Sequence, residues 1–247
     1  MKSTRHKKTS LFCRIFAVVS ILTGLPLSSP AETEGDSSGR SVKIRVLPHD
    51  LSGISDQLYC MDPSGALAPI KPRRGKLSQS YAAQVTGGAI RFYSSQDYDK
   101  TKPEEHLMVS MRIPETSDAL IILLFPSRQS EDPSDAVEYK LIDETQARFP
   151  GGESRVINLS DKRIRVKAGE HQLAVEPDDV GRIPKVEASN EYKMAQTNFY
   201  LHHEGTFMAI SERQVRYSER IRRIYIVSDR SKSGRLNLKT VVDPVVP

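Results

Sequence analysis

The stretch Ala119-Leu-Ile-Ile-Leu-Leu-Phe125 decides the fold of this chain. Every residue in it is apolar, and Pro114 and Pro126 stand close to its two ends. Such a run is short for a buried helix, whereas a fully buried strand has this length and this continuous apolar pattern. We therefore predict a central strand with both faces covered. Because side chains alternate along a strand, one face carries Leu120, Ile122 and Leu124, and the other carries Ile121, Leu123 and Phe125.

The rest of the chain consists of short runs rich in β-branched and aromatic residues, separated by Gly, Pro, Asp and Ser. No long segment has the apolar spacing of a helix, and many short strands at even spacing favour β-sandwiches. The sequence thus predicts an all-β protein with no substantial helix beyond its N-terminal segment. The expected strands are 42–47, 58–61, 80–85, 89–94, 107–113, 119–125, 137–142, 155–159, 164–167, 172–175, 192–195, 198–202, 207–211, 214–217, 223–227 and 236–242.

A weak internal repeat indicates two domains. The segment 117–128 (SDALIILLFPSR) aligns without gaps on 218–229 (SERIRRIYIVSD), 101 residues later, and VEYKLID before Glu144 is followed by a similar NLKTVVD before Pro244. About one hundred residues is the size of one immunoglobulin-like sandwich. We predict two tandem Ig-like sandwiches, at 41–143 and 154–243, joined by a linker at 144–153. In the second copy, Arg222 and Arg223 predict one solvent-facing side.

The N-terminus has the three parts of a secretory signal peptide. Five Lys and Arg residues precede a short apolar run at 15–27, and Ser29-Pro30-Ala31 supplies small residues for cleavage after Ala31. An uncleaved membrane anchor is the alternative, but it needs ~20 apolar residues. Cleavage leaves 31 Lys and Arg against 31 Asp and Glu, so the net charge of +5 belongs to this segment. We expect export to the periplasm or medium, no transmembrane span afterwards, and a disordered segment at 32–40.

The second half resembles a pattern of uncharacterised exported bacterial proteins. Residues 149–160 read FPGGESRVINLS and are followed by a short strand and a K-A-G turn. These residues are similar to a pattern of F-P-x-G, then R-x-x-N-L-S/T, then a strand and a P-G-like turn, although Pro177-Asp178 stands where P-G is common. The resemblance would cover about 107–242. It implies an Ig-like sandwich and export, and it brings no catalytic residues.

Few residues point to chemistry. Cys60 remains the sole cysteine after cleavage, and we interpret it as a buried apolar residue rather than a reactive thiol. His202 and Glu204 share a strand face and are weak metal-ligand candidates without a third ligand. Arg220, Arg222 and Arg223 could form a patch for an anionic partner, or a solvated face balanced by nearby acids.

The sequence gives only weak signals for sugar binding and for hydrolysis. The chain has no Trp, and its tyrosines at strand positions more commonly cap a core than stack on sugars. Carboxylates that a glycosidase could use lie in expected turns, where acidic residues are commonplace. The tyrosines are Tyr93, Tyr98, Tyr192, Tyr200 and Tyr217. The carboxylates are Glu131, Asp132, Asp135, Asp178, Asp179 and Glu187.

These observations favour an exported, non-enzymatic protein with a binding or envelope role, because no catalytic motif accompanies the all-β pattern. No catalytic or cofactor-binding residue and no cofactor is predicted. The expected partner is an envelope polymer or another exported protein, and not a nucleic acid. One alternative is an extracellular or periplasmic hydrolase with loop carboxylates. Another is a periplasmic chaperone-like protein, which would present the strand 236–242 as a free edge.

Overall fold

The computed structural model describes residues 39–50, 54–97, 99, 101–102, 104–127, 137–203, 205–229 and 236–245. Within these ranges the chain forms strands and no helix, which confirms the all-β prediction. The predicted signal peptide and residues 32–38 lie outside the described residues. Arg40 donates a hydrogen bond to the carbonyl of Pro114 at 2.9 Å, so this last residue of the expected disordered segment belongs with the fold.

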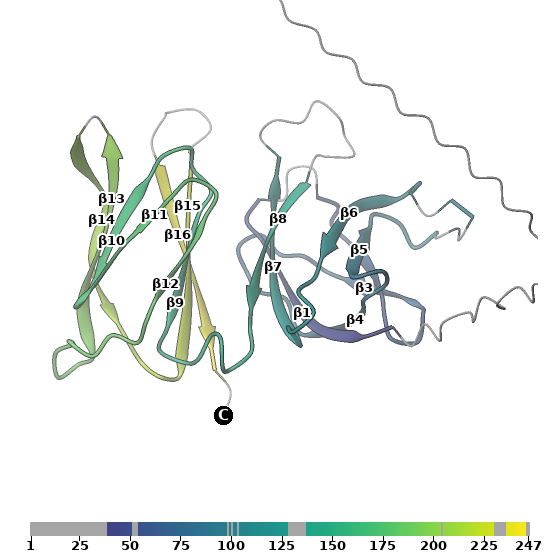
Figure 1. The fold of residues 1–247 in the computed structure, drawn as a ribbon, viewed down its shortest axis with the longest axis horizontal. Coiled ribbons are helices and arrows are strands. Elements are labelled where there is room, and N and C mark those ends of the chain that lie inside the picture. The colour runs from purple at the N-terminus through teal and green to yellow at the C-terminus, as the bar shows by residue number, and fades with distance from the viewer. Residues whose placement is uncertain are drawn as a thin grey trace, which may run out of the picture. The chain divides into compact units, whose positions relative to one another are not determined.

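The first sandwich consists of two four-stranded sheets. One sheet has the order β4-β1-β7-β8 and the other has the order β3-β2-β5-β6. Figure 1 shows them as facing layers. Their strands are β1 (Ser41–Pro48), β2 (Leu58–Met61), β3 (Leu67–Ile70), β4 (Tyr81–Gln84), β5 (Ala89–Tyr93), β6 (Leu107–Arg112), β7 (Ala119–Pro126) and β8 (Val137–Asp143).

The second sandwich repeats this topology strand for strand. Its sheets have the orders β12-β9-β15-β16 and β11-β10-β13-β14. The parallel pair β1–β7 has its counterpart in β9–β15, and the repeat seen in the sequence superposes β7 on β15 and β8 on β16. The strands are β9 (Ser154–Asn158), β10 (Ile164–Ala168), β11 (His171–Val175), β12 (Val180–Ile183), β13 (Met194–His203), β14 (Thr206–Arg216), β15 (Ile221–Asp229) and β16 (Leu236–Pro244).

Strand β7 is buried on both faces, as predicted. Leu120, Ile122 and Leu124 belong to the core of the first sandwich, which also holds Phe92 and Met111. The opposite face belongs to a separate apolar cluster that joins the two sandwiches. That face carries Ile121, Leu123 and Phe125.

The cluster between the sandwiches is made by the sheets that contain β7 and β15. Leu47 and Ile142 contribute from the first sandwich, and Ile157, Ile224 and Ile226 contribute from the second. These residues are nearly fully excluded from solvent, so burial of their apolar surface favours holding the two sheets together. The same burial explains why β7 and β15 are apolar over most of their length.

The motif residues of the resemblance have a structural role. Asn158 is fully buried, and its Nδ2 donates toward the carbonyls of Lys162, Val175 and Glu176 at 2.8–3.1 Å. Its Oδ1 accepts from the hydroxyl and the backbone N–H of Ser160. This side chain therefore ties the end of β9 to the end of β11. A buried amide with its partners satisfied is stabilising, whereas an unsatisfied one is costly.

Four strands differ from the strands that the sequence predicted. Strands β13 and β14 are each continuous, where we predicted two shorter strands, and β3 and β12 were not predicted. Polar residues such as Gln196 and Glu212 interrupted the apolar alternation. They are accommodated because they lie on the solvent side of a long antiparallel pair, where the backbone ladder continues regardless of side-chain polarity.

Candidate binding face

The three arginines expected to form an anionic-partner patch do not share a surface. Arg222 and Arg223 are each 6% exposed, so the prediction of a solvent-facing side on this strand is wrong. The reason is alternation within a strand that is covered on both sides: Arg222 shares its face with Ile224 in the cluster between the sandwiches, and Arg223 shares its face with Tyr225 in the second core. Only Arg220 is exposed.

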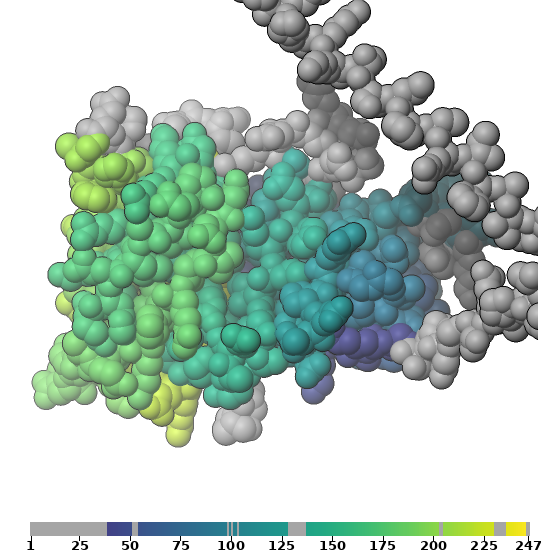
Figure 2. Space-filling view, viewed as in Figure 1, coloured from purple at the N-terminus to yellow at the C-terminus, as the bar shows by residue number. Residues whose placement is uncertain are grey.

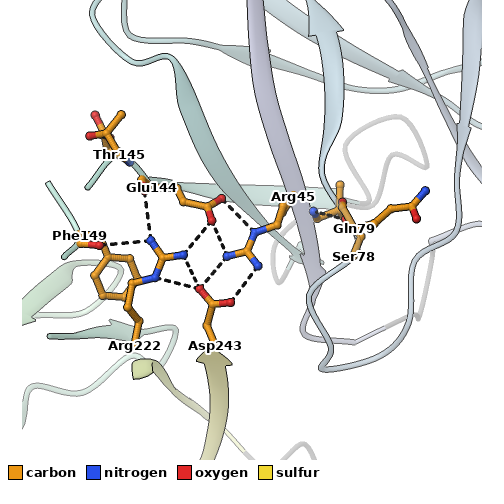
Figure 3. A network of polar contacts seen from close by, with 10 residues as sticks. Arg45, Ser78, Gln79, Glu144, Thr145, Phe149, Arg222 and Asp243 are labelled. Atoms are coloured by element: carbon orange, nitrogen blue, oxygen red, sulfur yellow. Dashed lines mark hydrogen bonds and ion pairs between the residues drawn. The ribbon is translucent and has the colours of Figure 1, made fainter. Parts of the chain in front are cut away.

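Arg222 takes part in a buried ion-pair network, drawn in Figure 3. Its guanidinium donates to Asp243 at 2.6 and 3.0 Å and to the side chain of Glu144 at 2.9 Å. Arg45, from the first sandwich, binds Asp243 through two parallel hydrogen bonds of 2.7 and 2.8 Å and also donates to Glu144. The ring of Phe149 lies 4.9 Å from the Arg222 guanidinium carbon. The network thus links β1 to β15 and β16 through the segment that follows β8.

The charges in this network offset one another. Burial alone would raise the pKa of Asp243, but the hydrogen bonds and charges of Arg45 and Arg222 outweigh it and hold that pKa below its ordinary value. Hydrogen bonds to Asp243 and Glu144 likewise raise the pKa of Arg45 despite its burial. These groups are already paired with each other, so they are a structural connection between the sandwiches rather than a site for an external anion.

The metal candidates are not completed by a third ligand. His202 lies on β13, and its ring packs against Phe207 with centroids 5.0 Å apart. Glu204 lies outside the described residues. Among the residues that the structure describes, no three His, Cys, Asp or Glu side chains gather as metal ligands. Cys60 is buried in the first core, and this burial raises its pKa to about 12.

Three of the six carboxylates considered for hydrolysis belong to the described residues. Asp178 and Asp179 are exposed in the turn before β12, whereas Glu131, Asp132 and Asp135 lie outside the described residues. Glu187 lines a hollow of about 160 Å³ together with Glu219. Both contact the amine of Lys185, at 3.2 and 2.6 Å. The Lys185 hydrogen bond lowers the pKa of Glu219, which is opposite to what a general acid requires.

The strand considered as a chaperone edge is β16. Among the described strands, β16 pairs with β15 alone and forms one edge of its sheet. Within the same described part of the chain, β14 forms an edge of the facing sheet and pairs only with β13. Pairing of β16 on both sides would have excluded the chaperone-like alternative. The described strands do not show such pairing, so this alternative is not excluded.

The outer face of the sheet β11-β10-β13-β14 is hollowed at two adjoining places. The first hollow has a volume of about 330 Å³, and the second has a volume of about 310 Å³. Arg165, Gln172 and Phe207 line both hollows. Arg163 and His202 line the first, and Lys167 and Tyr200 line the second. We call this surface the outer face of the second sandwich, and in Figure 1 it belongs to the layer formed by β10, β13 and β14.

Phe207 is the exposed aromatic residue of this face. It is 50% exposed. The guanidinium carbon of Arg165 lies 5.2 Å from its ring centroid, and the ring of His202 packs beside it. Arg165 in turn donates to Gln172 at 2.6 Å. These contacts hold an aromatic ring and a cation in place at the surface. The light-green atoms of β14 are visible at the surface in Figure 2.

A row of hydrogen-bonded side chains extends across the outer face from β14 to β13 and back. Gln214 donates to Gln196 at 3.1 Å, Gln196 to Asn198 at 2.6 Å, and Asn198 to the hydroxyl of Tyr200 at 2.8 Å. The Tyr200 hydroxyl donates to Glu212 at 2.9 Å, which raises the pKa of that tyrosine. The row therefore preorganises several amide and hydroxyl groups that face solvent.

A β-bulge in β14 determines which of its side chains lie on this face. Phe199 pairs with Ser211 while Tyr200 pairs with Ala209, so Ile210 is an extra residue in β14. Without the extra residue, Phe207 and Glu212 would point to opposite faces, since they are an odd number of residues apart. With it, both lie on the outer face with Tyr200.

Sequence reasoning singled out Tyr200 and His202 from this face and missed Arg165, Gln172 and Phe207. The alternation of Ile164-Arg-Val-Lys-Ala168 was a usable signal, because it separates inner apolar from outer basic residues. Of the other tyrosines considered for sugar stacking, Tyr93 and Tyr217 are buried, Tyr192 is 69% exposed, and Tyr98 lies outside the described residues.

Comparison with known proteins adds little. No family model matches the chain, and no curated protein matches it. A solved structure from Bacteroides ovatus, described as a "putative cell adhesion protein", is similar with a TM-score of 0.24 and 5% identity, covering 85% of this chain and 99% of its own. At that TM-score the likeness carries no functional argument. In the part of the chain that the structure describes, no helix is long and apolar enough to cross a membrane.

Proposed function

We propose that this protein is an exported, non-enzymatic binding protein that holds a polysaccharide on the outer face of its second sandwich. The observation that carries the proposal is the exposed Phe207 ring, fixed between Arg165 and His202 beside two adjoining hollows. A rigid aromatic ring beside fixed polar groups is the arrangement by which ligand sites obtain both contact area and orientation.

The polar row supports a hydroxyl-rich ligand. Amides and the Tyr200 hydroxyl both donate and accept hydrogen bonds, as sugar hydroxyls do. Asn198 and Gln196 are already oriented by their neighbours, so less conformational entropy is lost when a ligand binds them. Export is supported by the signal-peptide pattern of residues 1–31.

A hydrolase is less well supported at this face. Glycosidases use two carboxyl groups about 5–10 Å apart in one cleft. Neither hollow of the outer face is lined by an Asp or Glu among the described residues. The described residues of this face thus include groups that could orient a sugar chain, and no pair of carboxylates lines its hollows.

The test is affinity electrophoresis of the exported protein through gels that contain soluble neutral or acidic polysaccharides. Phe207→Ala should abolish the retardation that a bound polymer causes. Met208→Ala is the matched control, because Met208 is 55% exposed on the same strand but points to the opposite face. Equal retardation of wild type and Phe207→Ala, or no retardation in any gel, would overturn the proposal. Intact mass of the exported protein tests cleavage after Ala31.

A further inference from the structure

We propose that the ligand of the outer face is an acidic sugar chain, with Arg165 as the residue that binds its carboxylate. This inference rests on the function proposed above and names the ligand class for the same face. It is carried by the distribution of charge around the two hollows.

Among the described residues, the charged side chains that line the hollows are all basic. They are Arg163, Arg165 and Lys167, which alternate along one side of β10 and its preceding residue. Arg163 is paired with Glu176 at 2.8 Å, which leaves Arg165 and Lys167 as the cations for a ligand. Same-face neighbours on a strand are about 6.6 Å apart, so the two cations can contact one extended chain.

Arg165 has the geometry of a carboxylate-binding residue. Within the described residues, its guanidinium forms one hydrogen bond, to Gln172, and lies near the ring of Phe207. A guanidinium has five N–H donors, and a carboxylate accepts two of them side by side. Phe207 and Gln172 restrict the orientation of the guanidinium, so a carboxylate bound there has a sugar ring placed beside the exposed aromatic ring.

The acidic group of this face limits where the ligand carboxylate can lie. Glu212 accepts the hydroxyl of Tyr200 and pairs in register with Asn198, which in turn lies opposite Lys167. The row that contains Arg165 continues through Tyr200 to Ala209 and contains no acid. A ligand carboxylate is therefore favoured at Arg165 and disfavoured toward the Glu212 end.

The number of exposed aromatic rings separates this ligand from single-stranded nucleic acid, which is also an anion. Nucleic-acid grooves combine a basic track with aromatic residues that stack successive bases. Among its described residues, the outer face has one exposed phenyl ring, and the hydroxyl of Tyr200 is engaged by Glu212 and Asn198. This arrangement suits one stacked sugar ring with hydrogen-bonded hydroxyls better than a series of stacked bases.

The experiment compares polygalacturonate and alginate with their esterified forms, in which the same sugar backbone has lost its carboxylate charge. Wild type should bind the acidic forms at least about tenfold more tightly, because a charge-assisted hydrogen bond is worth that much. Arg165→Met keeps the aliphatic stem and should reduce this preference to within about twofold. Arg112→Met, an exposed arginine on β6 of the first sandwich, is the control and should leave the preference intact.

The outcomes separate the inference from the proposed function. Equal affinity for acidic and esterified chains, with binding still lost in Phe207→Ala, would overturn the acidic ligand and leave polysaccharide binding standing. An unchanged preference in Arg165→Met would overturn the role of Arg165. Tighter binding of an oligothymidylate or of anionic vesicles than of either acidic polymer would overturn the inference, and failure to bind any polysaccharide would overturn both proposals.

Discussion

Replacing Arg222 tests the ion-pair network between the two sandwiches. Its guanidinium donates to Asp243, to the side chain of Glu144, and to the carbonyls of Glu144 and Phe149 at 3.1 and 3.2 Å. The side chains of Arg222 and Asp243 are only 8% and 3% exposed, so water can replace few of these bonds. Removing one partner of a buried ion pair costs about 3–5 kcal/mol, because it leaves the other charge uncompensated.

We therefore expect Arg222→Ala to lower the free energy of unfolding by about 3–5 kcal/mol. For a folded unit of this size, that loss corresponds to a fall in Tm of about 6–20 °C. The solvent-facing position that the sequence predicted for Arg222 would instead imply a change below about 1 kcal/mol, as for other surface residues. Urea unfolding followed by circular dichroism distinguishes the two values directly.

The matched control is Arg220→Ala, two residues away in the chain and exposed. It should change the unfolding free energy by no more than about 0.5 kcal/mol. A double-mutant cycle between Arg222 and Asp243 should give a coupling energy of about 0.5–3 kcal/mol. If Arg222→Ala unfolds with the same midpoint and slope as Arg220→Ala, the network does not stabilise the protein and the reasoning fails.

Three further predictions concern stability and reactivity. The folded-state pKa of Asp243 is lowered, so its contribution to stability is full above the unfolded pKa of about 3.9 and is lost as the pH falls through the folded pKa. Urea midpoints measured from pH 6 to pH 2 should therefore fall less steeply in Asp243→Asn than in wild type. Parallel curves for the two proteins would contradict this. Ile122→Asp and Leu123→Asp should each prevent folding, because either buries an unpaired charge at a residue with no exposed surface, and a cooperative melt in either variant would refute two-sided burial of β7. Cys60 should resist iodoacetamide at pH 8 in the folded protein and react in urea, since burial raises its pKa to about 12, and fast labelling of the native protein would be the opposite result.

Much of the fold could be predicted because strand burial is encoded locally. The alternation along β1 and β10 and the continuous apolar run of β7 each identify which side chains face a core. The 101-residue offset between similar segments likewise anticipated that β7 and β15 occupy equivalent places. These signals depend on the period of a strand and on apolar burial, and neither requires knowledge of distant contacts.

The environment of the charged residues depended on tertiary structure. Arg222 and Arg223 have the sequence pattern of exposed residues, yet both are buried because β15 is covered by the second core on one side and by the first sandwich on the other. Arg45 and Asp243 are 198 residues apart in the chain, so no local pattern can show that they pair.

The candidate binding face depended on tertiary structure for a related reason. Arg165 comes from β10 and Gln172 from β11, whereas Phe207 comes from β14, and they meet only when the sheet has formed. The bulge at Ile210 then sets which side chains of β14 share a face with Tyr200. Strand period can be read from neighbouring residues, but strand register depends on the pairing of segments far apart in the chain, and register determines which polar and aromatic groups become neighbours.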